Sequence, residues 1–501
     1  MTVLHYRRIF LRVIAALAAQ GVTMLNNRNC FGTHGDGRHQ RNSRKRLNVD
    51  ATSPESSFMK TVVALASLVL AIPVARGADA PPIPVAAARA VFVRAHALCS
   101  ADGGRLWGRT LCGPLMLADP RTHAAIANVR LPGAKRSGAY YRLTLPASVP
   151  IANAPFEYHG IRFAQIIWPL AGDADEQAVT LMHESFHRIQ PKLGFVVKGS
   201  RNADAMISGD PALDTESGRI WLRGEIHALR AALTSRGIAR KKALTDALEL
   251  RAYRHAILPS TVGPEHVLDI MEGLAESTGI DVGLPPSHRL AYTLHDMNFV
   301  EKAPSYARTF FFAIGPAYSE LLDAVEPHWR GMVTMKTSIA ALAARAYGIK
   351  VVTPPAHVAQ AILARYGGAA IERQEAARAA KEAKRDAAYR AELVVGRTLR
   401  LPLRRFKIGF NPTNLERLGR YGAVYHHVMV SAPWGRIVVS HGDALIDGRF
   451  HALTVAAPLS VAGRTVRGRG WVLTLSGDAK IVPDPKKAGS YTVSFARRAA
   501  H

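Results

Sequence analysis

A single His-Glu-x-x-His string, in "LMHESFHRIQ" at residues 181–190, constrains this 501-residue chain more than any other feature. On an α-helix, residues four apart project from one face, so His183 and His187 can reach one ion together. Neutral imidazoles bind zinc well, and Glu184 lies beside them, where a carboxylate can take a proton from water whose pKa the ion has lowered. The spacing predicts a zinc site with Glu184 as the general base, against the alternative of an ordinary histidine pair on a helix.

The surroundings of the string favour the metal interpretation. "DADEQAVTLMHESFHRIQ" opens with acidic residues, which stabilise a helix N-terminus, and stops at Pro191, so we expect one helix over residues 173–190. The segment before it, "HGIRFAQIIWPL", is rich in β-branched and aromatic residues. We expect this segment to be the edge strand on which a peptide substrate lies by β-addition.

The third ligand decides the class of zinc protein. A metzincin would carry a further histidine six residues after His187, with a glycine before it. The sequence has Leu193 at that position and Gln190 in place of the glycine, so the metzincin interpretation fails. Downstream, "IMEGLAESTG" places Glu272 and Glu276 four residues apart, on one helical face.

The string "EGLAE" at residues 272–276 resembles the E-G-x-A-E motif of the aminopeptidase-like gluzincin zinc metallopeptidases. This resemblance implies a zincin-like fold in which Glu272 is the third zinc ligand and Glu276 orients the imidazole of His183. The HESFHR…EGLAE arrangement is also similar to that of uncharacterised exported bacterial proteins, a likeness that implies no substrate. The alternative for both glutamates is an ordinary acidic helix surface.

Two departures from the gluzincin pattern leave alternatives open. First, the gap between His187 and Glu272 is longer than is usual in that class, so further helices must lie between the ligands. Glu225 in "WLRGEIHALRA" is therefore a rival third ligand, and His227 a weaker one.

The second departure concerns the tyrosine of the Tyr-x-x-Gly pattern, whose phenol stabilises the oxyanion in that class. In "FFFAIGPAY" Phe312 stands at the tyrosine position before Gly315, and phenylalanine cannot donate a hydrogen bond. Tyr318 is the candidate replacement, with Tyr306 and His295 as alternatives. Losing one oxyanion donor costs roughly 10²–10³ in rate, so weak activity is an open outcome.

The start of the chain resembles a secretory signal displaced from its usual position. "MKTVVALASLVLAIPVARGADAPP", from Met59, has a short basic start, an apolar run and small residues, which predicts a signal peptide at 59–80. Residues 1–58 are then an over-extended N-terminus. The alternative makes the apolar run near residue 10 an anchor and the run after Met59 a membrane span, but both runs are short for a span. We expect a periplasmic or secreted protein without a stable transmembrane anchor.

Cysteine usage agrees with export. Cys30 lies in the segment before the signal, which leaves Cys99 and Cys112 as an even pair. In an oxidising compartment this pair could close a short loop, contributing about 3 kcal/mol to stability. The alternative is two unpaired thiols.

The pattern of apolar and polar residues changes along the chain and predicts an α+β fold. Residues 81–354 are expected to form a mainly helical zincin-like domain with a short β-sheet edge, and residues 355–394 a charged connecting helix. Short strand-like runs divided by Gly and Pro predict a small all-β C-terminal domain at 395–501.

The formal net charge of +27 could suggest an anionic partner. Part of it comes from residues 1–58, and the remaining arginines show no aromatic-interleaved basic motif, so we expect no specific nucleic-acid binding. The leading hypothesis is an exported zinc-dependent hydrolase, most concretely a metallopeptidase with a peptide or protein substrate. The alternative is a catalytically weak or inactive zinc-binding envelope protein.

Overall fold

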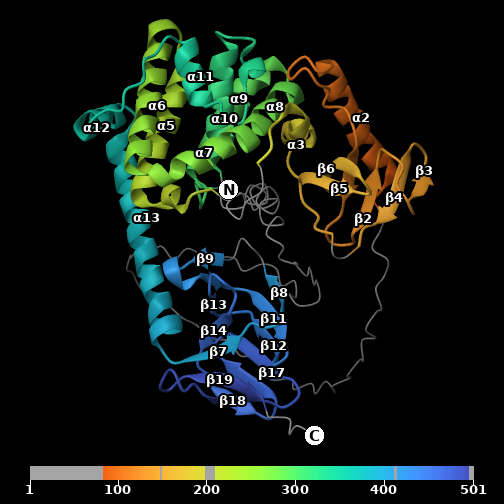
Figure 1. Ribbon diagram of the computed structural model, residues 1–501, viewed down its shortest axis with the longest axis vertical. Coiled ribbons are helices and arrows are strands. Elements are labelled where there is room, and N and C mark those ends of the chain that lie inside the picture. Colours follow the sequence, from red (N-terminus) through yellow and green to blue (C-terminus); the bar gives the residue numbers. More distant parts are fainter. Residues whose placement is uncertain (1–82, 147–148, 198–208, 308, 411–414, 496–501) are drawn as a thin grey trace, which may run out of the picture. The chain divides into compact units, whose positions relative to one another are not determined.

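The computed structural model describes residues 83–146, 149–197, 209–307, 309–410 and 415–495 (Figure 1). The predicted signal peptide at 59–80 and the extension at 1–58 lie outside these ranges. Within the described ranges, no helix combines the length with the apolar character that a bilayer crossing demands. The chain has the predicted α+β fold, in which helices dominate the middle of the sequence and two β-sheets occupy the C-terminal region.

The α-helices are α2 (Val85–Asp102), α3 (Ala174–Ile189), α5 (Glu216–Thr234), α6 (Gly237–Ile257), α7 (Val262–Leu268), α8 (Leu274–Gly283), α9 (Pro286–Glu301), α10 (Phe310–Asp323), α11 (Ile339–Ala346), α12 (Ala356–Arg365) and α13 (Gly368–Tyr389). The π-helical turns are η5 (Asp269–Gly273) and η7 (Arg390–Val395). The 3-10 turns are η2 (Gln190–Leu193), η3 (Pro211–Asp214), η4 (Pro259–Thr261), η6 (Trp329–Met332) and η9 (Gly419–Tyr421).

The first strands are β1 (Leu115–Ala118), β2 (Ala124–Ala127), β3 (Lys135–Ser137), β4 (Tyr140–Thr144), β5 (Ala154–Tyr158) and β6 (Ile161–Ile167). The C-terminal strands are β7 (Thr398–Pro402), β8 (Lys407–Phe410), β9 (Leu415–Arg417), β10 (Ala423–Tyr425), β11 (Val428–Ala432), β12 (Gly435–Val439), β13 (Ala444–Ile446), β14 (Ala452–Ala456), β15 (Ser460–Ala462), β16 (Thr465–Gly468), β17 (Trp471–Leu475), β18 (Ala479–Pro483) and β19 (Tyr491–Phe495).

The first six strands form one sheet in the order β3-β4-β2-β1-β6-β5. Alternate residues of β1 and β6 enter two different cores. Leu117 and Ile166 face α2 and α3, whereas Met116 and Phe163 face the loops on the other side. A sheet that is covered on both faces explains the continuous apolar runs of these two strands.

The expectation that the segment 159–170 is the edge strand is wrong. β6 pairs with β1 in parallel and with β5 in antiparallel register, so it is an interior strand. The edge is β5, which pairs only with β6 among the described strands. Burial explains the difference, because the end of β6 is apolar on both faces, a pattern typical of an interior strand.

Helix α3 carries the His-Glu-x-x-His string and begins where the acidic residues predicted. The side chain of Asp173 accepts a hydrogen bond from the backbone N–H of Glu176 at 2.9 Å. The backbone N–H of Asp173 in turn donates to the carboxylate of Glu176 at 3.2 Å. This reciprocal cap satisfies N–H groups that a helix start leaves unpaired, and it fixes the first residue of the helix.

Helices α3 and α8 lie close together, because α8 presents two glycines to α3. A Cβ atom on Gly279 would lie 2.7 Å from the carbonyl oxygen of Val179. A Cβ on Gly283 would lie 2.9 Å from the backbone of Ala178. These are backbone contacts that cannot swing away, so only glycine permits this separation of the two helices.

The predicted single connecting helix at 355–394 is two helices, α12 and α13, separated at Gly367, which has a φ of 83°. The first half of α13 belongs to the helical core, since Glu375 is 3% exposed and accepts from Arg219 at 2.8 Å and Arg223 at 3.0 Å. The charge pattern of 355–394 alone does not distinguish these buried pairs from solvated ones.

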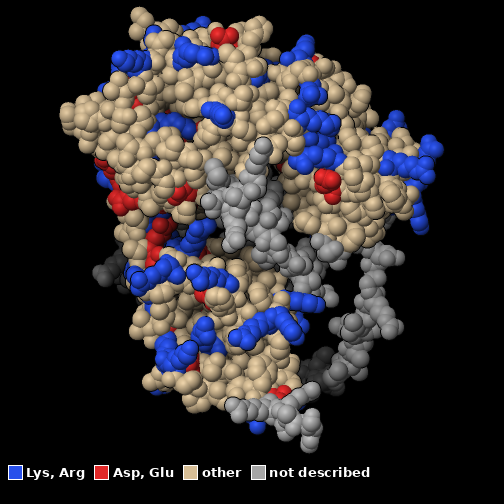
Figure 2. Space-filling view, in the orientation of Figure 1, with Lys and Arg blue, Asp and Glu red and all other residues tan. Residues whose placement is uncertain are grey.

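The C-terminal strands form two sheets around one apolar core. One sheet has seven strands in the order β18-β19-β7-β14-β13-β10-β9, and the other has six in the order β15-β16-β17-β12-β11-β8. Leu401 and Leu453 of the first sheet share a core with Ile437 and Leu473 of the second, which makes this region a β-sandwich. Figure 2 shows Lys and Arg distributed over both the helical region and the sandwich on the visible face.

We predict that Gly279→Ala and Gly283→Ala each lower the free energy of unfolding by about 1–3 kcal/mol, because overpacking outweighs the gain in helix propensity of about 1 kcal/mol. Gly331→Ala is the matched control, since nothing lies within 4 Å of a Cβ there. Its change should stay within about 0.5 kcal/mol. Denaturant unfolding measures all three, and unchanged stability of the α8 variants would show that the helices do not need this closeness.

Candidate metal centre

The two histidines of α3 and Glu272 of the π-helical turn η5 form a triangle of ligand atoms. The Nε2 atoms of His183 and His187 are 2.9 Å apart. The Oε2 atom of Glu272 is 3.6 Å from Nε2 of His183 and 3.4 Å from Nε2 of His187. Among the described residues, these three are the group that could hold a metal ion, with all ligand atoms within 4.8 Å of one another.

The other ring nitrogens determine what the triangle presents to an ion. Nδ1 of His183 lies 2.8 Å from Oε2 of Glu276, and Nδ1 of His187 lies 2.7 Å from Oε1 of Gln190. Both partners are acceptors, so each Nδ1 carries a proton and, in the neutral ring, each Nε2 presents a lone pair. Two lone pairs and a carboxylate oxygen therefore converge on one point, an arrangement that only a cation or a proton makes favourable.

The dimensions of the triangle fit zinc. Tetrahedral zinc with bonds of about 2.0–2.1 Å keeps its ligand atoms about 3.3 Å apart. The edges of the triangle formed by His183, His187 and Glu272 run from 2.9 to 3.6 Å around this value. Three protein ligands would leave a fourth position for water or substrate, as in catalytic zinc sites.

Close packing of glycines positions the third ligand. Glu272 lies in η5, and a π-helical turn inside an α-helix is often found at functional sites. A Cβ on Gly315 of α10 would lie 2.4 Å from Cα of Gly273, so the two backbones touch. The glycine of the "EGLAE" string thus lets α10 support the turn that carries Glu272.

Gln190 orients a histidine of the candidate site, a role that its sequence position, where a metzincin has glycine, did not indicate. Its side chain is 1% exposed, and while Oε1 accepts from His187, Nε2 donates to the carbonyl oxygen of Met271 at 2.7 Å. One amide therefore orients a ligand and ties the end of α3 to η5. The available signal was a glutamine one turn after His187, just before Pro191.

Glu184 is buried, with 3% exposure, on the turn of α3 between the two ligands. Its negative charge favours the protonated form of both histidines and so helps to raise the pKa of each. A buried carboxylate on this turn makes Glu184 the candidate general base if the site holds a metal ion.

The rival ligands lie elsewhere. Glu225 is fully buried in an ion network, where it accepts from Arg254 at 2.6 Å and from Arg251 at 3.3 Å. Arg254 also pairs with Glu265 at 2.6 Å, and Arg251 contacts Asp269 at the start of η5. His227 is engaged by Glu301 and by the carbonyl oxygen of Tyr366.

The expected oxyanion donors are also engaged elsewhere. Tyr318 is the main correction, since its hydroxyl donates to Glu225 at 3.0 Å inside the buried ion network. The hydroxyl of Tyr306 donates to the carbonyl oxygen of Glu301 at 3.0 Å, and His295 is on the exposed face of α9. Phe312, by contrast, does border the site, with its ring centroid 6.4 Å from that of His183. The predicted tyrosine position is therefore beside the site, and its side chain has no donor.

The carboxylates control the protonation of the metal-free site. Burial lowers the pKa of the His183 imidazole, but hydrogen bonds to Glu272 and Glu276 outweigh burial and raise it to about 9. Burial also lowers the pKa of His187, but the negative charge of Glu272, its hydrogen bond and the charge of Glu184 together raise it by more, so the net change is a rise. Although burial raises the pKa of Glu272, the two imidazoles hold it well below its usual range, so this ligand stays ionised.

Comparison with known proteins finds no matching family model, no matching curated protein and no matching solved structure. The geometry of the triangle and the hydrogen bonds that orient its histidines are therefore the evidence for a metal site.

We predict that zinc affinity rises steeply with pH up to about pH 9. The cause is that His183, with a pKa of about 9 in the metal-free protein, must lose a proton before it can bind the ion. Each displaced proton changes the dissociation constant about tenfold per pH unit below that pKa. Chelator competition between pH 6 and pH 8 measures the slope, and Glu276→Gln should flatten it. An affinity independent of pH would contradict this assignment.

Proposed function

We propose that this protein is a zinc-dependent hydrolase that cleaves peptide bonds. The observation that carries the proposal is the convergence of two oriented imidazoles and one ionised carboxylate on a single point, with Glu184 buried on the same helix turn. A three-ligand site beside a carboxylate is the arrangement that metal-assisted hydrolysis needs.

Each residue of the site has a distinct role in the proposed hydrolysis. Zinc, when bound, polarises a substrate carbonyl and lowers the pKa of water. Glu184 accepts a proton at a carboxylate oxygen and can return it to the departing amine. Glu276 and Gln190 keep the two imidazoles in the tautomer that leaves Nε2 available.

The edge of the N-terminal sheet supports a peptide substrate. β5 contacts α3, and among the described strands it pairs on one side only. An extended peptide could pair with the open side of β5 through backbone hydrogen bonds.

Export is part of the proposal. The structure contains a disulfide between Cys99 and Cys112, and disulfides persist mainly in oxidising compartments. We propose a periplasmic or secreted protein.

A second candidate is a zinc-binding protein with little or no hydrolytic activity. The observation that favours it is Phe312 at the edge of the site, together with the Tyr318 hydroxyl held by Glu225. Both candidates require the ion, so metal content does not separate them, whereas turnover does.

We predict that Glu184→Gln retains stoichiometric zinc and loses at least about 10²-fold in kcat, because the amide keeps the shape of the side chain but cannot accept the proton. His187→Ala should lose the metal itself. Metal analysis and hydrolysis of a mixed peptide library check both variants. Zinc-loaded wild-type protein that cleaves no peptide would favour the second candidate, and wild-type protein without zinc affinity would overturn both.

We further predict that Phe312→Tyr raises kcat by about tenfold or more, because the phenol adds a hydrogen-bond donor at the edge of the site. Phe311→Tyr is the matched control, since Phe311 packs against Phe312 with ring centroids 4.4 Å apart and its ring is likewise buried. Equal effects of the two substitutions on kcat would show that position 312 does not face the reacting carbonyl.

A further inference from the structure

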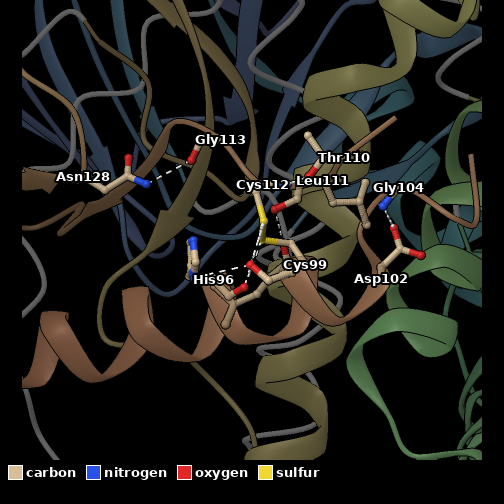
Figure 3. The surroundings of a disulfide bond; sticks show 12 residues. His96, Cys99, Asp102, Gly104, Thr110, Leu111, Cys112, Gly113 and Asn128 are labelled. Carbon is tan, nitrogen blue, oxygen red and sulfur yellow. Dashed lines mark hydrogen bonds between the residues drawn. A yellow bond between two sulfur atoms is a disulfide. The ribbon is translucent and has the colours of Figure 1, made fainter. Parts of the chain in front are cut away.

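The loop between α2 and β1 contacts both helices that hold the metal-site residues. Cys99 lies in the last turn of α2 and Cys112 lies shortly before β1, and their disulfide closes the loop between them (Figure 3). Leu111 and Cys112 point their carbonyl oxygens toward α3, and Trp107 is buried beside α3 and α8.

The loop holds the end of α3 through Arg188, which directly follows the ligand His187. One guanidinium nitrogen of Arg188 donates to the carbonyl oxygens of Leu111 at 2.9 Å and Cys112 at 3.0 Å. Gly113 allows this fit, because a Cβ there would lie 2.4 Å from the guanidinium carbon. The side chain of Arg188 is buried, so these carbonyls replace the water that its charge would otherwise require.

Trp107 joins the two helices through a single side chain. Its ring packs on Phe186 of α3, with centroids 4.9 Å apart. Its Nε1–H donates to the hydroxyl of Thr278 on α8 at 2.9 Å, and Thr278 follows Glu276 by two residues. The indole therefore contacts α3 one residue before His187 and α8 two residues after the carboxylate that orients His183.

We propose that the closed loop 99–112 is a redox-sensitive clasp that holds α3 and α8 at the separation the metal site needs, so that opening the disulfide weakens metal binding. The proposal rests on the metal-binding part of the proposed function. Trp107, Thr278 and Arg188 are positioning residues in this scheme, since they act through the helices and not on the ion.

The disulfide is placed so that a small reductant can reach it. Cys112 is partly exposed, and both cysteines line a cavity of about 280 Å³ together with His96, Asn128 and Ser185. A dithiol can attack one sulfur to form a mixed disulfide, which its second thiol then resolves. The chain gains two electrons and two protons as two thiols, and the dithiol leaves as a cyclic disulfide.

The alternative is that the disulfide only stabilises the fold and does not affect the metal site. Measuring the zinc affinity of the folded protein with the disulfide open distinguishes this alternative from the clasp. The double variant Cys99→Ser with Cys112→Ser should remain folded by circular dichroism and bind zinc about tenfold more weakly than the oxidised wild type. Wild-type protein reduced with a phosphine, which forms no thiolate complex with zinc, should show the same loss. Unchanged affinity in the folded, open-loop protein would overturn the clasp.

Trp107→Phe and Thr278→Val test the clasp without touching the disulfide, and they apply even if the cysteine variant does not fold. Each removes the hydrogen bond between the loop and α8, and each should weaken zinc binding several-fold. Trp221→Phe is the matched control, because Trp221 is 8% exposed against 9% for Trp107 and packs on Tyr253, away from the loop. Equal zinc affinity in Trp107→Phe, Thr278→Val and wild type would overturn the proposal, whereas absence of zinc binding in oxidised wild type would instead overturn the proposed function.

Discussion

The close approach of α3 and α8 is the constraint on which the candidate site depends. Gly279 and Gly283 remove the side chains that would hold the helices apart, and only then can Glu276 reach Nδ1 of His183 at 2.8 Å. The same close packing of α8 on α3 places Glu272, in the preceding turn η5, beside the two imidazoles. Glycine also permits the contact with a third helix, since Gly315 of α10 touches the backbone of Gly273 in η5. The geometry of the candidate site therefore depends on glycines at the contacts between these helices.

Charge explains why such a site could hold a cation. Three carboxylates, those of Glu184, Glu272 and Glu276, surround two imidazoles, and only Glu272 has substantial exposure, with 26% of its side chain accessible. Buried carboxylates are costly unless positive charge or hydrogen bonds compensate them. In the metal-free protein, protons on the histidines provide part of that compensation. A divalent cation could replace these protons at the same point, so the raised pKa values of the histidines and a capacity to hold a metal would have one electrostatic origin.

Much of the site was predictable, because its elements are local patterns. The spacing of His183 and His187 places them on one helix face, and the predicted bond between Cys99 and Cys112 is present. The α+β fold was also predictable, because the sequence changes from helical periodicity to short strand-like runs along the chain. Tertiary contacts account for what was missed: Gln190 matters only because η5 lies beside it, and Tyr318 is occupied only because α5 brings Glu225 to it. No single-sequence pattern encodes which distant helix will lie alongside.

The buried ion network that includes Asp269 of η5 has a consequence for how the chain can change over evolutionary time. Arg254 is completely enclosed between Glu225 and Glu265, and Arg251 links Glu225 to Asp269 at the start of η5. Removing one member would leave an opposite charge without compensation in a region that water does not reach. Such positions are expected to be substituted in concert, so that a relative lacking Arg254 would also lack at least one of its two carboxylates.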